Sequence, residues 1–299
     1  MVQLTKPVGV VGLGLMGQAF VKRLDEDSEP VLGFDVSPQR CVELGEHRVS
    51  HSLSSLAKAC SVIILSVFNT EQVEEAIFGK DGLMTRHSLD NPLYFICTST
   101  CDPDSIKDIA KRCHDLGAFF LELPISGTSK QVVQGDCLGL MGGSESLCEE
   151  LTPVLDIICP RRVHVGTQGD ASRAKLAINL VLGLHRGAMA EGLNFGKSIG
   201  LDPEKLLPIL QNSAAASSVM KTKGPLMVKR QYENPQSRVD QSLKDFGLIQ
   251  QLGNGAQQHL PMTEIYIKLL QNCVANDESL LDNAIIFEAI ARNALKKTK

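Results

Sequence analysis

The sequence predicts an α/β domain with a parallel sheet, followed by an all-α domain, with one long helix joining the two. Three observations carry this prediction. Short β-branched and apolar runs alternate with helix-like segments in the first half of the chain, and a glycine-rich turn directly follows the first run. From residue 171 onward, only helical patterns recur. Strand–helix–strand alternation implies right-handed crossovers and therefore a parallel sheet.

The strand candidates are short runs rich in Val, Ile, Leu and Phe. They lie at residues 8–12, 31–35, 62–67, 93–97 and 119–122. Residues 138–141 and 162–165 could add one or two strands at the end of this domain. Between the strands, residues 72–77 and 105–116 show the apolar spacing of helices.

The joining helix is predicted at residues 171–199. This segment contains no proline and has apolar side chains on most faces, so we expect a helix of roughly 40 Å, buried nearly all round. Further helices are expected at 203–213, 242–252, 262–277 and 280–297. The expected limits are therefore 1–168 for the α/β domain, 169–200 for the joining helix and 201–299 for the all-α domain.

Composition narrows the class of protein. The 299 residues suffice for about two domains. The formal net charge is −4. The sequence has no basic patch or basic tail of the kind that binds nucleic acid. No apolar run approaches the ~18–20 residues of a membrane helix, and no targeting pattern is visible. The nine cysteines are an odd count without framework spacing, typical of a reducing compartment, and no metal-ligand spacing stands out. We expect a cytoplasmic protein without a metal, membrane or nucleic-acid partner.

A glycine-rich turn marks a candidate nucleotide site. The turn reads Gly12-Leu13-Gly14-Leu15-Met16-Gly17. It is a GxGxxG motif between a strand candidate and a helix-like segment, the order found in a Rossmann-type dinucleotide-binding domain. Asp35 ends the second strand candidate, where a carboxylate binds both ribose hydroxyls and repels a 2′-phosphate. No arginine directly follows Asp35, the next being Arg40, so NAD is favoured over NADP. The plain alternative is a structural glycine turn with Asp35 capping a loop.

Four segments, in order, resemble one enzyme family. They are Val10-Val11-Gly12-Leu13-Gly14-Leu15-Met16-Gly17, Glu122-Leu123-Pro124-Ile125-Ser126-Gly127, Lys175-Leu176-Ala177-Ile178-Asn179 and Lys244-Asp245. They are similar to the dinucleotide turn and to the D-x-P-V-S-G-G, K-x-x-x-N and KD patterns of the β-hydroxyacid dehydrogenases. That family includes 3-hydroxyisobutyrate, tartronate semialdehyde and threonate dehydrogenases. The resemblance covers essentially the whole chain and implies NAD-dependent oxidation of a small hydroxy acid, or reduction of its oxo acid.

Lys175 and Asn179 are the candidate catalytic pair. Four residues apart on a helix, they share one face. A lysine at the start of a buried apolar helix is costly, and burial lowers the pKa of its amine, so Lys175 is expected to exchange a proton with the substrate hydroxyl. Asn179 would orient the substrate. The alternative is a lysine that extends to solvent beside a polar cap.

The resemblance assigns the remaining candidates. Ser126, Gly127 and Thr128 would bind the substrate, with Ser126 and Gly127 at its carboxylate. Thr128 stands where the family usually has a second glycine, and it would narrow the pocket or add a hydroxyl contact. Its cofactor residues are those of the turn and Asp35, together with Val67, Phe68, Thr100 and Lys244. For Phe68 and Thr100 the alternative is a loop-capping role, and for Lys244 it is a solvated ion pair with Asp245.

Three other functions fit the same scaffold. An imine or ketone reductase commonly lacks the helix lysine, so Lys175 argues against it. A ketopantoate-type reductase usually prefers NADP, which Asp35 disfavours. A non-catalytic dinucleotide-binding module would keep the glycines and lose the Lys–Asn pair. The apolar helices of the second domain also predict a homodimer or homotetramer.

Overall fold

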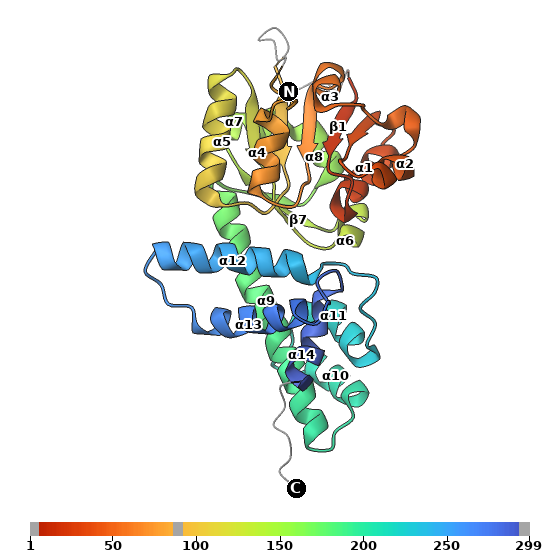
Figure 1. Cartoon of the computed structure of the whole chain (residues 1–299), viewed down its shortest axis with the longest axis vertical. Coiled ribbons are helices and arrows are strands. Elements are labelled where there is room, and N and C mark those ends of the chain that lie inside the picture. Colours follow the sequence, from red (N-terminus) through yellow and green to blue (C-terminus); the bar gives the residue numbers. More distant parts are fainter. Residues whose placement is uncertain (1–5, 86–91, 293–299) are drawn as a thin grey trace. The chain divides into compact units, whose positions relative to one another are not determined.

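The structure, a computed structural model, describes residues 6–85 and 92–292. The chain divides into two compact units, Met1–Lys175 and Leu176–Lys299. The first unit is an α/β domain and the second is helical (Figure 1). The predicted fold class, a Rossmann-type domain followed by an all-α domain and a long helix, is confirmed.

A twisted sheet forms the centre of the first unit. Its parallel strands are β1 (Val8–Val11), β2 (Val31–Phe34), β3 (Val62–Leu65), β4 (Tyr94–Cys97) and β5 (Phe119–Glu122). They lie in the order β2-β1-β3-β4-β5, as successive right-handed crossovers produce. All five match the strands expected from the sequence.

The sheet is mostly parallel, as expected, but two pairings at its far edge are antiparallel. There β7 (Leu138–Gly142) runs antiparallel to β5 and to the short strand β6 (Ile125–Ser126), while β8 (Arg162–Gly166) runs parallel to β7. The connection from β6 to β7 contains α6 (Ser129–Val133), a helix of 5 residues. This connection is too short for a parallel crossover. Strand β6 was not anticipated, because 2 residues leave no periodic pattern.

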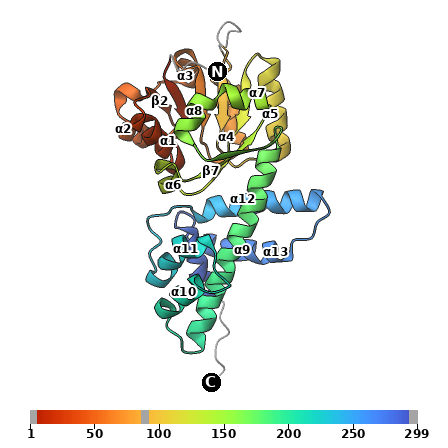
Figure 2. The same ribbon diagram turned by 180° about the vertical axis from the view of Figure 1, so that it is seen from behind.

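Helices cover both faces of this sheet (Figures 1 and 2). They are α1 (Leu15–Glu26), α2 (Pro38–Leu44), α3 (Leu53–Ala59), α4 (Thr70–Phe78), α5 (Pro103–Asp115), α6, α7 (Glu145–Glu150) and α8 (Thr152–Ile158). Successive strand residues point to opposite faces: Val10 and Ile64 join the core on the α1 side, whereas Ile63 and Leu65 join the core on the α4 side. Burial on both faces explains why the strands are continuous apolar runs.

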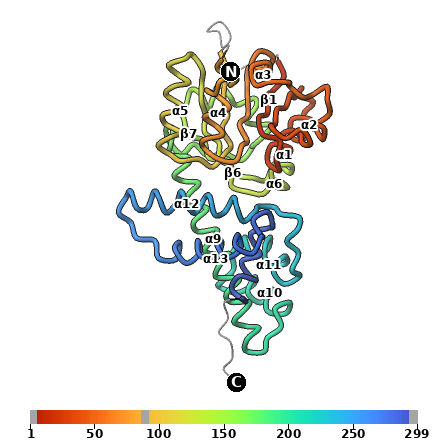
Figure 3. The backbone as a smooth tube through the Cα atoms, in the orientation of Figure 1, coloured from red at the N-terminus to blue at the C-terminus, as the bar shows by residue number. Residues whose placement is uncertain are grey.

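The second unit is built of helices in the part that the structure describes (Figure 3). It contains most of α9 (Asp170–Ser198), then α10 (Pro203–Gln211), α11 (Ser218–Lys229), α12 (Val239–Gly255), α13 (Pro261–Val274), the short 3₁₀ turn η2 (Asn283–Ile285) and α14 (Ile286–Arg292). Its core includes Phe246 of α12 and Tyr266 of α13, whose ring centroids are 4.4 Å apart. A Cβ at Gly183 of α9 would lie 2.4 Å from the Phe246 ring, so α9 packs closely against this pair.

Three helical details differ from expectation. Helix α11 was not anticipated; in the structure it runs through Gly224 and Pro225, and a Cβ at Gly224 would lie 2.5 Å from Leu207 Cδ1. The helix expected at 280–297 begins only after Asp282, whose carboxylate caps η2, and residues 293–297 lie outside the described part. The expected all-round burial of α9 is wrong for the chain taken alone, since Val181 is 50% and Phe195 63% exposed.

Within residues 6–85 and 92–292, no helix combines the length and the hydropathy needed to cross a membrane.

Candidate active site

The glycine turn joins β1 to α1. Gly12 adopts φ +89°, and a Cβ there would lie 2.4 Å from the Ser66 carbonyl oxygen. A Cβ at Gly17 would lie 1.8 Å from the Gly12 carbonyl oxygen. At Gly14, by contrast, no atom of the described residues beyond its own chain neighbours lies within 4 Å of a Cβ position. The fold itself therefore requires Gly12 and Gly17, whereas Gly14 leaves open space at the start of α1.

That open space suits a phosphate group. Gly14 is the N-cap of α1 and offers no side chain to the first backbone N–H groups, and the first turn carries no acidic residue. A helix N-terminus of this kind presents N–H donors and the positive end of the helix dipole to an anion. The turn therefore fits the pyrophosphate of a dinucleotide. Leu13 is buried, whereas Leu15 is exposed and Met16 is half-buried.

Asp35 lies beside this turn, directly after β2. Its carboxylate accepts hydrogen bonds from the backbone N–H of Leu13 at 2.7 Å and of Ser37 at 2.8 Å. The Arg40 guanidinium lies 3.3 Å from the same carboxylate. Sequence reasoning gave Arg40 no role; the first turn of α2 brings it back to Asp35. This pair bears on cofactor choice, because an arginine at this edge binds a 2′-phosphate.

The contrast between Gly14 and Gly17 predicts two outcomes. Gly17→Ala is expected to destabilise the fold by about 1–3 kcal/mol or more, because its Cβ meets backbone that has no room to move. Gly14→Ala should leave the melting temperature almost unchanged but weaken dinucleotide binding about tenfold or more, because the methyl group occupies the space that fits the pyrophosphate. Thermal unfolding and NADH fluorescence titration check both. Equal loss of stability in the two variants would contradict this reading.

The other candidate cofactor residues follow neighbouring strands. Val67 and Phe68 come after β3, and Thr100 comes after β4. The Ser99 hydroxyl joins the two loops: it accepts the Val67 N–H at 3.0 Å and donates to the Val67 carbonyl at 2.8 Å. Since the carboxyl ends of β1 to β4 share one edge, the structure brings these residues to the same edge as Gly12 and Asp35.

Cys97, the last residue of β4, is fully buried beneath this edge. A hydrogen bond with Cys101, and then burial, raise the pKa of the Cys97 thiol. Cys97 therefore stays protonated and acts as a packing residue. Within the described part of the chain, no group of three or more His, Cys, Asp or Glu side chains is placed to hold a metal ion.

The candidate substrate loop lies between β6 and α6. Ser126 is half-buried and Gly127 is exposed. The Thr128 hydroxyl accepts the Gln131 N–H at 3.3 Å, and the Gln131 side chain accepts the Thr128 N–H at 2.9 Å. These two bonds form a capping box at the start of α6. Thr128, which departs from the family pattern, therefore serves to order the end of this loop.

Lys175 points toward this loop. Its side chain is buried, and its Nζ donates a hydrogen bond of 2.8 Å to the Ile125 carbonyl oxygen. Ile125 directly precedes Ser126, so the candidate catalytic amine and the candidate substrate loop lie side by side. The side chain is directed to the protein interior.

Asn179 lies one turn further along α9 and belongs to the second unit. Its Nδ2 donates to Asp245 Oδ2 at 2.8 Å, and Asp245 Oδ1 lies 3.0 Å from Lys244 Nζ. The structure thus joins Asn179 to the Lys244–Asp245 pair of α12. Sequence reasoning assigned Asp245 no function of its own, although the KD pattern could have drawn attention to it.

Comparison with known proteins identifies the family. Residues 7–166 match the model of the NAD binding domain of 6-phosphogluconate dehydrogenase. Residues 169–290 match that of the NAD-binding domain of NADP-dependent 3-hydroxyisobutyrate dehydrogenase. The chain belongs to the β-hydroxyacid dehydrogenase family. As a member of this family it is an oxidoreductase with NAD(P)-binding domains, and the two matched models leave the choice between NAD and NADP open.

Individual proteins similar to this chain support the same family. Escherichia coli 2-hydroxy-3-oxopropionate reductase is 28% identical over 285 residues, which cover 95% of this chain and 96% of that protein. Arabidopsis thaliana glyoxylate/succinic semialdehyde reductase 1 is also 28% identical, over 95% of this chain and 98% of that protein. The crystal structure of Salmonella typhimurium 3-hydroxyisobutyrate dehydrogenase has a TM-score of 0.85 at 23% identity, covering 95% of this chain and 99% of that one, and shows the same fold.

Proposed function

We propose that this chain is an NAD-dependent dehydrogenase that interconverts a small β-hydroxy acid and its oxo acid, of the 3-hydroxyisobutyrate, tartronate semialdehyde/glycerate or threonate type. The observation that carries the proposal is the hydrogen bond from Lys175 Nζ to the Ile125 carbonyl, which places an amine beside Ser126. The relatives that act on small oxo acids and semialdehydes support the same substrate class.

The first unit offers a site that fits a dinucleotide. The start of α1 and the open space at Gly14 would receive the pyrophosphate, and Asp35 the ribose hydroxyls. Val67, Phe68 and Thr100 would line the same edge, with Lys244 near the nicotinamide. When bound, the nicotinamide accepts or donates the hydride equivalent of the reaction.

The chain's own residues would bind the substrate and move its proton. Ser126 and the Gly127 backbone would hold the carboxylate, and Asn179 would orient the hydroxyl group, itself positioned by Asp245. Lys175 would accept the hydroxyl proton during oxidation and return it during reduction. The Ile125 carbonyl would keep the amine in place between turnovers.

An absorbance assay with three- and four-carbon hydroxy acids and their semialdehydes, run with NAD(H) and with NADP(H), tests this function. Turnover of at least one such acid is expected, and the best substrate identifies the enzyme. A parallel panel of cyclic imines and ketones tests the reductase alternative. Tight dinucleotide binding without turnover of any compound would overturn the proposal in favour of a binding module.

Cofactor preference is expected to depend on Asp35 and Arg40. Wild type should prefer NAD, because the Asp35 carboxylate repels a 2′-phosphate. Asp35→Asn keeps the shape, removes the charge and releases Arg40, so the ratio of kcat/KM for NADP to that for NAD should rise about tenfold or more. In Asp35→Asn/Arg40→Ala most of this gain should disappear. A wild-type preference for NADP would contradict the assignment.

Self-association through the second unit is part of the proposal. The helical unit exposes the large apolar side chains Phe195, Ile199 and Ile209 around α9 and α10. Apolar side chains that gather on one surface mark protein–protein contacts, which supports self-association here. Sedimentation velocity measures whether the chain forms the predicted dimer or tetramer. A cytoplasmic location stays a prediction.

A further inference from the structure

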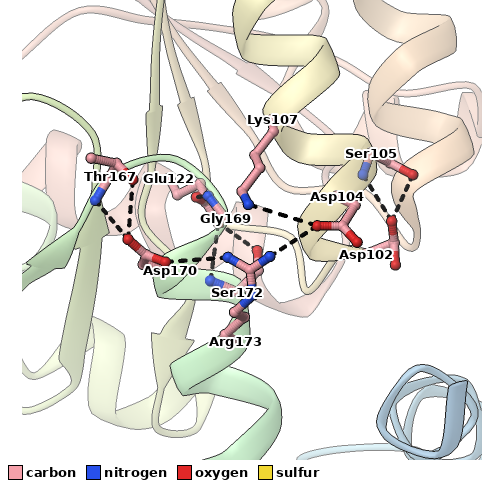
Figure 4. Close-up of polar contacts among 10 residues, drawn as sticks. All are labelled: Asp102, Asp104, Ser105, Lys107, Glu122, Thr167, Gly169, Asp170, Ser172 and Arg173. Atoms are coloured by element: carbon pink, nitrogen blue, oxygen red, sulfur yellow. Dashed lines mark hydrogen bonds and ion pairs between the residues drawn. The ribbon is translucent and has the colours of Figure 1, made fainter. Parts of the chain in front are cut away.

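Glu122 lies at the end of β5, outside the set of candidate site residues. Its side chain is 1% exposed. One carboxylate oxygen accepts the backbone N–H of Gly169, and the other accepts the N–H of Ser172 at 3.0 Å and the Ser172 hydroxyl (Figure 4). Gly169 directly precedes α9, and Ser172 lies in its first turn. Glu122 therefore holds the N-terminus of the helix that carries Lys175.

These bonds use the groups that a helix cannot satisfy internally. The first N–H groups of a helix have no partner within it, and its N-terminus carries a partial positive charge. A carboxylate from a neighbouring strand satisfies both. Burial nevertheless raises the pKa of Glu122 and outweighs the hydrogen bonds that lower it. A costly buried acid at this position indicates a specific requirement, because an apolar side chain with a local cap would fill the same space at a lower cost in free energy.

The surrounding backbone is shaped around this carboxylate. Gly142 of β7 pairs with Glu122, and a Cβ at Gly142 would lie 2.9 Å from Glu122 Oε1. Gly169 adopts φ +92°, the left-handed region that favours glycine, which lets its N–H face Glu122. Gly142 thus leaves room for the Glu122 carboxylate, and Gly169 supplies an N–H to it.

A second attachment lies three residues further along both segments. Ile125 follows Glu122 by three residues, Lys175 follows Ser172 by three, and Lys175 Nζ bonds the Ile125 carbonyl. The segment that leads to Ser126 is therefore joined to α9 at two successive levels. Two attachments on one face set both the axial position of the helix and its rotation about its own axis.

We propose that Glu122 is a positioning residue for proton transfer: through Gly169 and Ser172 it sets the height and rotation of the first turns of α9, and so holds Lys175 against the loop that carries Ser126 and Gly127. This inference rests on the proposed role of Lys175. Misplacement of a catalytic group by about 1 Å lowers the rate by up to about 100-fold, so loosening this attachment should affect turnover before it affects cofactor binding.

Arg173 supplies a matched control in the same turn of α9. Its guanidinium pairs with Asp170 at 3.2 Å and with Asp104 at 2.9 Å, in an exposed network that does not include Glu122 (Figure 4). Exposed pairs contribute little to stability. Arg173→Ala thus perturbs the same helical turn without touching the buried carboxylate.

The experiment compares Glu122→Gln, Ser172→Ala, Ser172→Thr, Arg173→Ala and Lys175→Ala on the best substrate. Each rate is divided by the concentration of sites that bind NADH, which removes the effect of unfolded protein. We expect kcat to fall about 10- to 100-fold in Glu122→Gln and Ser172→Ala, with a shifted pH profile of kcat and unchanged NADH affinity. Ser172→Thr, which keeps the hydroxyl, should recover most of the rate, and Arg173→Ala should match wild type.

Two outcomes overturn different statements. If Lys175→Ala turns over at the wild-type rate, the proposed function fails and the positioning role fails with it. If Lys175→Ala is inactive but Glu122→Gln and Ser172→Ala resemble Arg173→Ala in kcat and pH profile, only the role of Glu122 is overturned. Should Glu122→Gln not fold, the Ser172→Ala and Ser172→Thr pair decides the question.

Discussion

Replacement of Lys175 by alanine is expected to lower kcat roughly 100- to 10,000-fold, the usual contribution of a general acid–base group. NADH affinity should change little, because the Lys175 amine bonds the Ile125 carbonyl, directly before the candidate substrate loop. Stopped-flow or continuous nicotinamide absorbance at saturating substrate measures kcat, and fluorescence titration measures NADH binding. The pH dependence of kcat should lose the limb that belongs to the lysine.

Two further variants separate chemistry from charge and packing. Lys175→Arg keeps a positive charge that does not titrate, so it should be almost as slow as the alanine variant. Added methylamine should restore part of kcat in Lys175→Ala by acting as an external base. Lys197→Ala, at an exposed position of the same helix, is the control and should behave as wild type. Retention of kcat within about tenfold in Lys175→Ala would exclude Lys175 as the acid–base group.

Replacement of Asp282 by alanine is expected to cost about 3–5 kcal/mol of unfolding free energy, because it leaves the charge of Lys223 buried without its partner. Asp282 is fully buried and accepts bonds from Lys223 Nζ at 2.7 and 2.9 Å. It also accepts the backbone N–H groups of Gln236 and Ala284, both at 2.9 Å. Burial, together with the nearby Arg186, lowers the pKa of Lys223 to about 8 despite the attraction of Asp282. Asp282→Ala therefore removes all four hydrogen bonds and leaves the buried Lys223 amine without its charge partner.

Urea unfolding followed by circular dichroism measures this cost, since the second unit is helical. Lys221→Ala, at an exposed position of α11, is the control and should stay within about 0.5 kcal/mol of wild type. Lys223→Met/Asp282→Asn removes both charges and should be more stable than the sum of the single variants predicts. A loss below about 1 kcal/mol in Asp282→Ala would show that the pair contributes little.

Much of the fold could be predicted from the sequence because the local residue pattern matches the environment of each segment in the structure. The runs that became β1, β3 and β4 are buried on both faces, and burial of this kind selects continuous Val, Ile and Phe. The glycine turn was readable for a similar reason: Gly12 and Gly17 are required by close backbone contacts around the β1–α1 turn. Helix α9 was predicted within a residue at each end because the segment contains no proline and is apolar on most faces.

The errors lie where distant contacts override local pattern. Gly224 and Pro225 disfavour a helix, yet α11 runs through both of them, with Gly224 close to Leu207 of α10. The direction of β7 depends on which strand edge it meets after the short α6, a contact between segments distant in the sequence. The apolar character of α9 indicated burial on all sides, whereas in one chain several of its apolar side chains stay exposed.

The amino-acid sequence alone determined the α/β-then-α order, the dinucleotide turn, and Lys175 and Asn179 as the residues to examine, because each depends on neighbours close along the chain. Tertiary structure alone decided their partners. Lys175 meets Ile125, Asn179 meets Asp245, and Glu122 meets the start of α9, across 50, 66 and 47 residues of sequence respectively. Hydrogen bonds require partners within about 3 Å, and only the packing of strands and helices brings such distant groups that close.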